Sequence, residues 1–268
     1  MARPVLEVRN LCVGSGDAAA VRDVSFAVEA GRVLCVLGGE GAGKSQLLRC
    51  IGLDFAPVSG SILVRGVDVT GATSERRRQI RARSIELVHP PAPDGVRDLT
   101  VPGTRASLLI QGGPGATAPV AGMRQRIQIA KALSQEADAL LLDEPFVGVE
   151  HGVKLRILEL LHLLRAEAGT AVVVASRDPE VARSLADDIV VLDDGDVVEA
   201  GPAARVLESP SHHRTRALVE SRRSAWPGGL TRRCHWSQAG TGSGRWSRKV
   251  PVERLTSWPS PSRTVASA

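Results

Sequence analysis

Short apolar runs recur along the first 220 residues and are separated by longer polar or amphipathic stretches. Four of these runs are mostly aliphatic: residues 33–37, 85–88, 139–142 and 171–175. Such runs are typical of strands that are buried on both faces, as in a parallel sheet. Because helical stretches lie between them, the pattern predicts an α/β protein with a mostly parallel central sheet covered by helices on both faces.

The helices are predicted from apolar positions that recur every three or four residues. Residues 44–51 form one such stretch directly after the run 33–37, and residues 153–167 form another. In the second stretch, five side chains follow helical spacing: Leu155, Ile157, Leu158, Leu161 and Leu164. Segments 6–8 and 21–28 predict antiparallel edge strands, and 61–69 predicts a hairpin.

Composition narrows the class of protein. The chain has 268 residues, of which 43% are hydrophobic, enough for one large α/β domain or two small ones. Four cysteines are scattered without a C-x-x-C pair, and no signal segment opens the chain, so we expect a reduced, cytosolic protein. No uninterrupted apolar stretch approaches 18 residues, so a membrane role must come through a partner.

Positive charge is concentrated at the C-terminal end. Residues 226–268 contain seven Arg or Lys residues and a single acid, Glu253, together with all four tryptophans of the chain. The segment is rich in Ser, Gly and Pro and lacks periodicity, so we expect a disordered basic tail without a role. The alternative is a patch for nucleic acid or anionic lipid, because arginine and aromatic side chains suit phosphate contact and base stacking.

The strongest chemical signal follows the run 33–37. Eight residues there match the phosphate-binding pattern G-x-x-x-x-G-K-S/T: Gly38, Gly39, Glu40, Gly41, Ala42, Gly43, Lys44 and Ser45. Glycines allow backbone N–H groups to point into one concavity, the lysine reaches the β- and γ-phosphates, and the serine hydroxyl is a ligand for Mg²⁺. The segment therefore predicts a site for ATP and Mg²⁺, which we extend to Gln46 in the following helix.

A second signal ends the aliphatic run 139–142. Asp143 and Glu144 follow it directly, at the strand end where ligands bind in open α/β sheets. Asp143 is therefore expected to hold Mg²⁺, and Glu144 to orient and deprotonate the water that attacks ATP. Alone, an apolar strand followed by Asp-Glu-Pro could be an ordinary turn. Beside a phosphate-binding loop, the catalytic interpretation is favoured.

With these two motifs, residues 5–220 resemble the ATPase subunits of ABC transporters. The segment 122–133, which begins Gly-Met-Arg-Gln-Arg, resembles the helix after the ABC signature, and its start is similar to the oligopeptide/dipeptide/nickel importer branch. Segments 195–202 and 210–218 resemble the C-terminal element of that branch. The resemblance implies an ABC ATPase fold with a mixed central sheet, an antiparallel β edge subdomain and a helical subdomain.

The resemblance also implies partners. Two such subunits sandwich two ATP molecules, each between the phosphate loop of one and the signature of the other, and closure drives a membrane partner. We therefore expect permease subunits, a second ATP-binding subunit and a solute-binding protein as partners, at the inner face of the cell membrane. The expected domains are a nucleotide-binding domain at 1–225, with a reduced helical subdomain at about 90–121, and the tail at 226–268.

The chain departs from the family pattern at several positions. The family signature Leu-Ser-Gly-Gly-Gln is replaced by residues 119–123, where Val120 lacks the serine hydroxyl that would donate to the γ-phosphate of the partner. A homodimer would be poor at both sites, so a heterodimer is favoured. His89 takes the place of the glutamine that senses the metal and the membrane partner in the family. Arg177 replaces the histidine that contacts the γ-phosphate, and Glu150 replaces an aspartate.

The consequences of these replacements differ. Arg177 is expected to contact phosphate because of its charge, although it cannot switch as a histidine does. The alternative is a solvated residue at the start of the Asp178-Pro179 turn. His89, included in the nucleotide-binding set, has the alternative of an ordinary loop histidine.

Two absences matter as well. The chain has no tyrosine and no aromatic residue before Phe26, so the ring that stacks on adenine in the family is missing. Stacking is worth about 1–3 kcal/mol, so ATP binding is expected to be weakened by about one to two decades. Of the 32 residues from 90 to 121, 11 are Gly or Pro, which does not suit a full helical subdomain.

Three hypotheses follow. The favoured one is an ABC-type ATPase subunit that powers transport of peptides or related small solutes, with Glu144, Lys44 and Arg177 as catalytic residues. The second is a degenerate regulatory subunit that binds ATP without useful turnover. The third is a soluble ABC-like protein that acts on nucleic acid through its tail, which we hold to be the weakest of the three.

Overall fold

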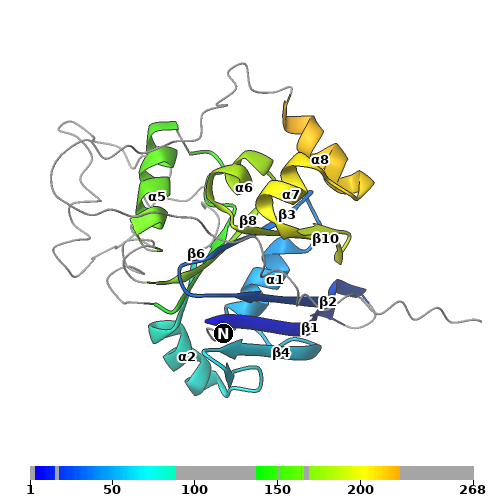
Figure 1. Cartoon of the computed structure of the whole chain (residues 1–268). Coiled ribbons are helices and arrows are strands. Elements are labelled where there is room, and N and C mark those ends of the chain that lie inside the picture. Colours follow the sequence, from blue (N-terminus) through cyan, green and yellow to red (C-terminus); the bar gives the residue numbers. More distant parts are fainter. Residues whose placement is uncertain are drawn as a thin grey trace, which may run out of the picture. The chain divides into compact units, whose positions relative to one another are not determined.

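Figure 1 shows the protein as a computed structural model. The structure describes residues 4–15, 18–88, 137–149, 151–163, 165 and 169–223. The chain divides into two compact units, Met1–Pro227 and Gly228–Ala268, and all described residues lie in the first. The expectations for 90–121 and for the tail 226–268 fall outside the described residues, so the domain boundaries stay predictions.

The central sheet has six strands in the order β10-β9-β3-β8-β7-β6. The strands are β3 (Val33–Gly38), β6 (Ile85–Val88), β7 (Ala139–Asp143), β8 (Ala171–Ser176), β9 (Asp188–Asp193) and β10 (Asp196–Pro202). Strands β3, β6, β7, β8 and β9 run parallel to one another, and β10 pairs antiparallel with β9. The expected mixed sheet is confirmed, and all four predicted buried strands belong to it.

Alternate residues of these strands face two different cores, as expected for strands buried on both sides. Leu34 and Leu141 point to the side of helix α1 (Lys44–Ile51) and the antiparallel sheet. Val33 and Leu140 point to the opposite side, where α5 (His151–Leu163) and α6 (Pro179–Leu185) pack. The sheet is therefore held between two layers (Figure 1).

The edge strands form a separate antiparallel sheet in the order β2-β1-β4-β5. Its strands are β1 (Leu6–Ser15), β2 (Ala18–Val28), β4 (Ser59–Val64) and β5 (Val67–Asp68). Leu6 pairs with Val28 on one side and with Val64 on the other. The predicted edge strands and the hairpin near 61–69 are confirmed, although β1 and β2 are longer than the short segments predicted.

Helix α1 has the predicted bounds, and α5 occupies most of the predicted stretch 153–167. Within α5, Ile157 and Leu161 are buried, but the residue Leu155 is 47% exposed. The expectation that Leu155 shares the apolar face is therefore wrong, because its position lies on the solvent side of the helix. Leu164 lies outside the described residues.

Four further helices of the described part were not predicted: α6, given above, and α2 (Ser74–Arg83), α7 (Ala203–Glu208) and α8 (His213–Arg223). In α2, five of ten residues are arginine, so no apolar periodicity marks it. Its N-cap is Thr73, whose side chain accepts a hydrogen bond from the backbone N–H of Arg76. None of the helices in the described part of the chain is long and apolar enough to cross a membrane.

One buried carboxylate ties the C-terminal helix to the sheet. The side chain of Glu199 on β10 is only 2% exposed. It accepts hydrogen bonds from the backbone N–H of Ser211 (3.0 Å) and of His212 (3.1 Å) and from the Ser211 hydroxyl (2.7 Å), and it pairs with Arg205 at 3.2 Å. Burial acts to raise the pKa of Glu199, but these donors outweigh it and lower the pKa to about 2.

Candidate functional site

The phosphate-binding loop links the end of β3 to the start of α1, as its sequence predicts. Gly43 has φ of +95°, and a Cβ there would lie 2.4 Å from the carbonyl oxygen of Ala20. Gly38 is confined in a similar way, since its Cβ would lie 2.5 Å from the carbonyl oxygen of Leu192. Both glycines are therefore needed for the backbone of the loop to pack against neighbouring strands.

Helix α1 begins without a side-chain cap, because its N-cap residue is Gly43. Its first backbone N–H groups therefore have no partner within the helix, and the positive end of the helix dipole adds to them. This combination favours an anion such as phosphate in front of the helix. Ser45 and Gln46 are exposed in the first turn, facing solvent at the same end.

Lys44 lies at the centre of the site. The residue is only 6% exposed, and its ammonium Nζ donates to the carbonyl oxygens of Gly38 (2.9 Å) and Gly39 (2.7 Å). The same nitrogen lies 3.6 Å from Oε1 of Glu144. The sequence separates the two residues by about a hundred positions, and the fold brings them together.

Asp143 and Ser45 form the second contact between the two motifs. The Ser45 hydroxyl donates to Oδ1 of Asp143 at 3.0 Å, and Asp143 is 2% exposed. Both are hard oxygen donors, and Mg²⁺ is usually held by one or two such protein ligands together with phosphates and water. The pair fits that requirement. In the described part of the chain, no group of three or more His, Cys, Asp and Glu residues could hold a metal alone.

Glu144 adopts an unusual backbone conformation directly after β7. Its φ is +45°, which is uncommon for a residue other than glycine, and its backbone N–H donates to the carbonyl oxygen of Ala175 at 3.0 Å. Oε2 of its carboxylate accepts a hydrogen bond from the backbone N–H of Arg177 at 3.4 Å. The conformation turns the carboxylate toward Lys44 and the end of β8.

The environment of Glu144 raises the pKa of its carboxyl group above the ordinary value. Burial is the main cause, and the negative charge of Asp143 adds to it. The charge of Lys44 and the hydrogen bond from Arg177 act in the opposite direction without cancelling the effect. A carboxylate with a raised pKa is a better proton acceptor, which suits a general base.

Arg177 follows β8, the strand that lies between β3 and β7 in the sheet. Its guanidinium NH1 lies 3.8 Å from Oε2 of Glu40, in the phosphate-binding loop. The next residue, Asp178, is the N-cap of α6 and accepts from the backbone N–H of Glu180 at 3.1 Å. The structure thus brings Arg177 beside both predicted motifs. His89 lies outside the described residues.

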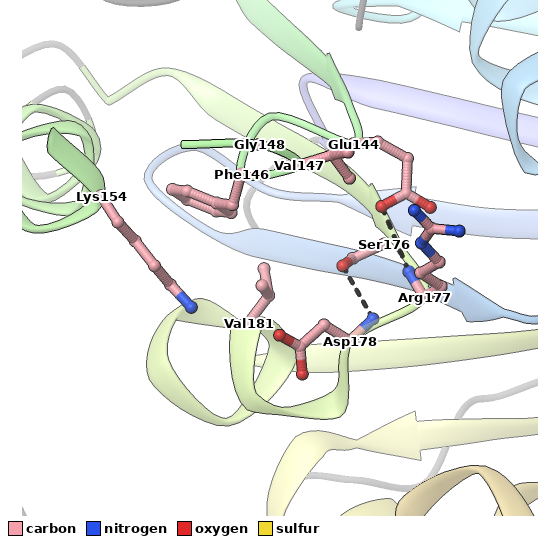
Figure 2. A pocket seen from close by; sticks show the side chains of 9 residues that line it. All are labelled: Glu144, Phe146, Val147, Gly148, Lys154, Ser176, Arg177, Asp178 and Val181. Atoms are coloured by element: carbon pink, nitrogen blue, oxygen red, sulfur yellow. Dashed lines mark hydrogen bonds between the residues drawn. The ribbon is translucent and has the colours of Figure 1, made fainter. Parts of the chain in front are cut away.

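A cavity of about 220 Å³ opens beside Glu144 (Figure 2). Its lining includes Phe146 and Lys154, whose ammonium lies 5.5 Å from the centre of the Phe146 ring. Neither residue was predicted as part of the site: no short sequence motif points to Lys154 on α5, and Phe146, although it follows the Asp-Glu-Pro segment, carries no group expected to act on ATP. The space is large enough for several water molecules next to the proposed base.

The fold and its loop define a class: α/β nucleotide-binding proteins with a phosphate-binding loop. A family model described as "ABC transporter" matches residues 21–92. Similar solved structures include a bacterial ABC transporter cassette seen as a dimer, with a TM-score of 0.63 at 23% identity over 74% of this chain and 98% of that chain. Another is CbiO1 from Clostridium perfringens, with a TM-score of 0.64 at 22% identity over 83% of this chain and 98% of that chain. These likenesses show the fold.

Curated relatives are more similar in sequence. PhnK of Escherichia coli, named as a phosphonates utilization ATP-binding protein, is 32% identical over 82% of this chain and 98% of its own length. DppF of Pseudomonas aeruginosa, named as a di/tripeptide transport ATP-binding protein, is 32% identical over 80% of this chain and 74% of its own length. The chain belongs to the ABC transporter ATP-binding family, whose members are ABC-type ATPases.

Proposed function

We propose that this subunit binds MgATP between the phosphate-binding loop and the ends of β7 and β8 and hydrolyses it to power transport through membrane permease subunits. The observation that carries the proposal is the convergence of Lys44, Ser45, Asp143 and Glu144, which are joined by contacts of 3.0 and 3.6 Å. Lys44 would neutralise the β- and γ-phosphates, and Ser45 and Asp143 would hold Mg²⁺.

Hydrolysis requires a group that takes a proton from the attacking water. Glu144 is assigned this role because it lies beside Lys44, its pKa is raised, and a cavity with room for water adjoins it. Arg177 is assigned to the terminal phosphate on the basis of its charge and its position at the end of β8. Backbone groups from Gly38 to Gly43 would surround the phosphates.

The transported solute is proposed to be a peptide or a related small molecule. Support comes from the name of DppF, a di/tripeptide transport protein, and from the resemblance of three segments to the oligopeptide/dipeptide/nickel importer branch. PhnK is named for phosphonates, and a relative from Ralstonia nicotianae at 31% identity is named for methionine import. We propose a peripheral location at the inner membrane face, with a second ATP-binding subunit as partner.

The second candidate is a subunit that binds ATP without useful turnover. Three replacements of family residues favour it: Val120 for the signature serine, His89 for the glutamine and Arg177 for the histidine that contacts the γ-phosphate. Mixing experiments separate the two: a catalytic subunit turns over ATP when a partner with an intact signature completes the site. A subunit of the second kind stays inactive at its own phosphate-binding loop in the same mixture.

The test of the site itself is Lys44→Ala. Removing the buried ammonium is expected to lower ATP affinity at least about 100-fold, because two phosphates lose their charge partner. Isothermal titration calorimetry with MgATP measures this directly. Arg49→Ala is the matched control, since Arg49 is an exposed cation in the last turn of the same helix. Unchanged binding in Lys44→Ala would place the nucleotide elsewhere.

A further inference from the structure

One ion pair crosses the mouth of the candidate site. The carboxylate of Glu40, in the phosphate-binding loop, lies 3.8 Å from the guanidinium of Arg177 at the end of β8. Glu40 has no other side-chain partner among the described residues, and its side chain is 93% exposed. A carboxylate this exposed on a glycine-flanked loop is free to leave its partner.

Arg177 is held more firmly than Glu40. Its backbone N–H donates to Oε2 of Glu144 at 3.4 Å, and its side chain is 43% exposed. Glu144 in turn lies 3.6 Å from Lys44 Nζ. The backbone of Arg177 is therefore held on the side of the site where Lys44 would meet the terminal phosphates, whereas the exposed carboxylate of Glu40 is movable.

The two cations Lys44 and Arg177 thus each face a glutamate. Lys44 faces Glu144, and Arg177 faces Glu40. A terminal phosphate carries more negative charge than a carboxylate and accepts several hydrogen bonds, so it is the stronger partner for a guanidinium. A nucleoside diphosphate lacks the γ-phosphate, so Arg177 is expected to keep its contact with Glu40 when a diphosphate binds.

We propose that Glu40 occupies Arg177 until a γ-phosphate replaces it, so that the pair responds to triphosphate and not to diphosphate nucleotides. The proposal rests on the function proposed above and concerns the regulation of that site. Binding of a triphosphate breaks the Glu40 contact, and loss of the γ-phosphate restores it. Glu40 is a specificity-determining residue, which lowers the affinity for triphosphate by competing for the same guanidinium.

The experiment measures the affinities of the full-length protein for ADP and for the non-hydrolysable triphosphate adenosine 5′-(β,γ-imido)triphosphate by calorimetry. Glu40→Gln is expected to tighten triphosphate binding about two- to fivefold, the range for an exposed ion pair, and to leave ADP binding within about 1.5-fold. Arg177→Gln is expected to weaken triphosphate binding only. In the double variant, the gain from Glu40→Gln disappears.

Glu180→Gln is the matched control, because Glu180 forms an exposed pair with Arg183 at 3.2 Å on the neighbouring helix α6. It is expected to change neither affinity. Equal tightening of ADP and triphosphate by Glu40→Gln would overturn the proposal, since it would show only general repulsion of anions. No tightening at all would overturn it as well.

Failure of this inference can be told apart from failure of the proposed site. If Lys44→Ala removes binding of both nucleotides while Glu40→Gln changes neither affinity, the nucleotide site is supported and the proposed role of Glu40 is refuted. If Lys44→Ala leaves both affinities unchanged, the nucleotide site itself is misplaced. Raising the salt concentration provides a further check, because it is expected to reduce the effect of Glu40→Gln as the exposed pair is screened.

Discussion

Two glutamates with largely buried side chains lie in different parts of the central sheet, one within the edge strand β10 and one directly after β7, and their surroundings differ. Glu199 is 2% exposed and Glu144 is 17% exposed at the side chain. Glu199 receives two backbone N–H groups and a hydroxyl and pairs with Arg205. Glu144 receives one long backbone hydrogen bond and the charge of Lys44.

The difference appears in the pKa values, which move in opposite directions. Donors lower the pKa of Glu199 to about 2, whereas burial raises that of Glu144. Glu199 also lies within β10, where the pairing with β9 shifts register between Val197 and Glu199, while Glu144 has φ of +45° directly after β7. A carboxylate satisfied by fixed donors stabilises the fold, and one left short of donors in a constrained backbone is available for proton transfer.

The largest effect is expected from Glu144→Gln. The amide cannot accept a proton from water, so ATP turnover is expected to fall about 10²- to 10⁴-fold. The unfolding free energy is expected to stay within about 0.5 kcal/mol, since a neutral amide suits the buried position. Steady-state phosphate release and urea unfolding measure the two quantities. Turnover close to that of the unchanged protein would remove Glu144 from the role of base.

Glu199→Gln is expected to show the reverse. Loss of the carboxylate removes charge-assisted hydrogen bonds that hold the start of α8, at a cost of about 2–3 kcal/mol in unfolding free energy at pH 7. Turnover per folded molecule stays unchanged, because Glu199 lies outside the site. Far-ultraviolet circular dichroism in urea is the suitable measurement, since all four tryptophans lie in the tail rather than in the described fold.

Both halves of this comparison show what sequence could and could not predict. Asp143, Glu144 and the loop around Lys44 were found because each belongs to a short contiguous motif after an aliphatic strand. Glu199 was not singled out, because its donors come from residues 211 and 212 across a helix. Contacts that depend on the register of distant segments leave no local pattern.

The same reason explains the misses in the fold. Strands β9 and β10 were not predicted, although residues 189–192 of β9 are aliphatic; β9 pairs with β3, and the more exposed β10 pairs with β9. Leu155 was assigned to the core because its spacing suits a helix, but periodicity alone does not fix which flanking positions face solvent. The pair between Glu40 and Arg177 likewise required the sheet order to be known.

The smallest expected effect concerns pH, and it sharpens the contrast between the two glutamates. Glu144 must be ionised to act as a base, and burial raises its pKa above the ordinary 4.5. Turnover is therefore expected to decline with acidification from a pH above 4.5, by a few-fold at first. Calorimetric titration of MgATP at each pH separates this decline from weaker nucleotide binding.

Unfolding is not expected to explain that decline. Because the pKa of Glu199 is lowered to about 2 in the folded protein, its stabilising effect is complete above its ordinary value of 4.5 and is lost only as the pH falls from there toward about 2. Circular dichroism should therefore stay constant over the interval in which turnover first declines. An acid limb at or below 4.5, or one that coincides with loss of the dichroism signal, would contradict the assignment of Glu144 as a base with a raised pKa.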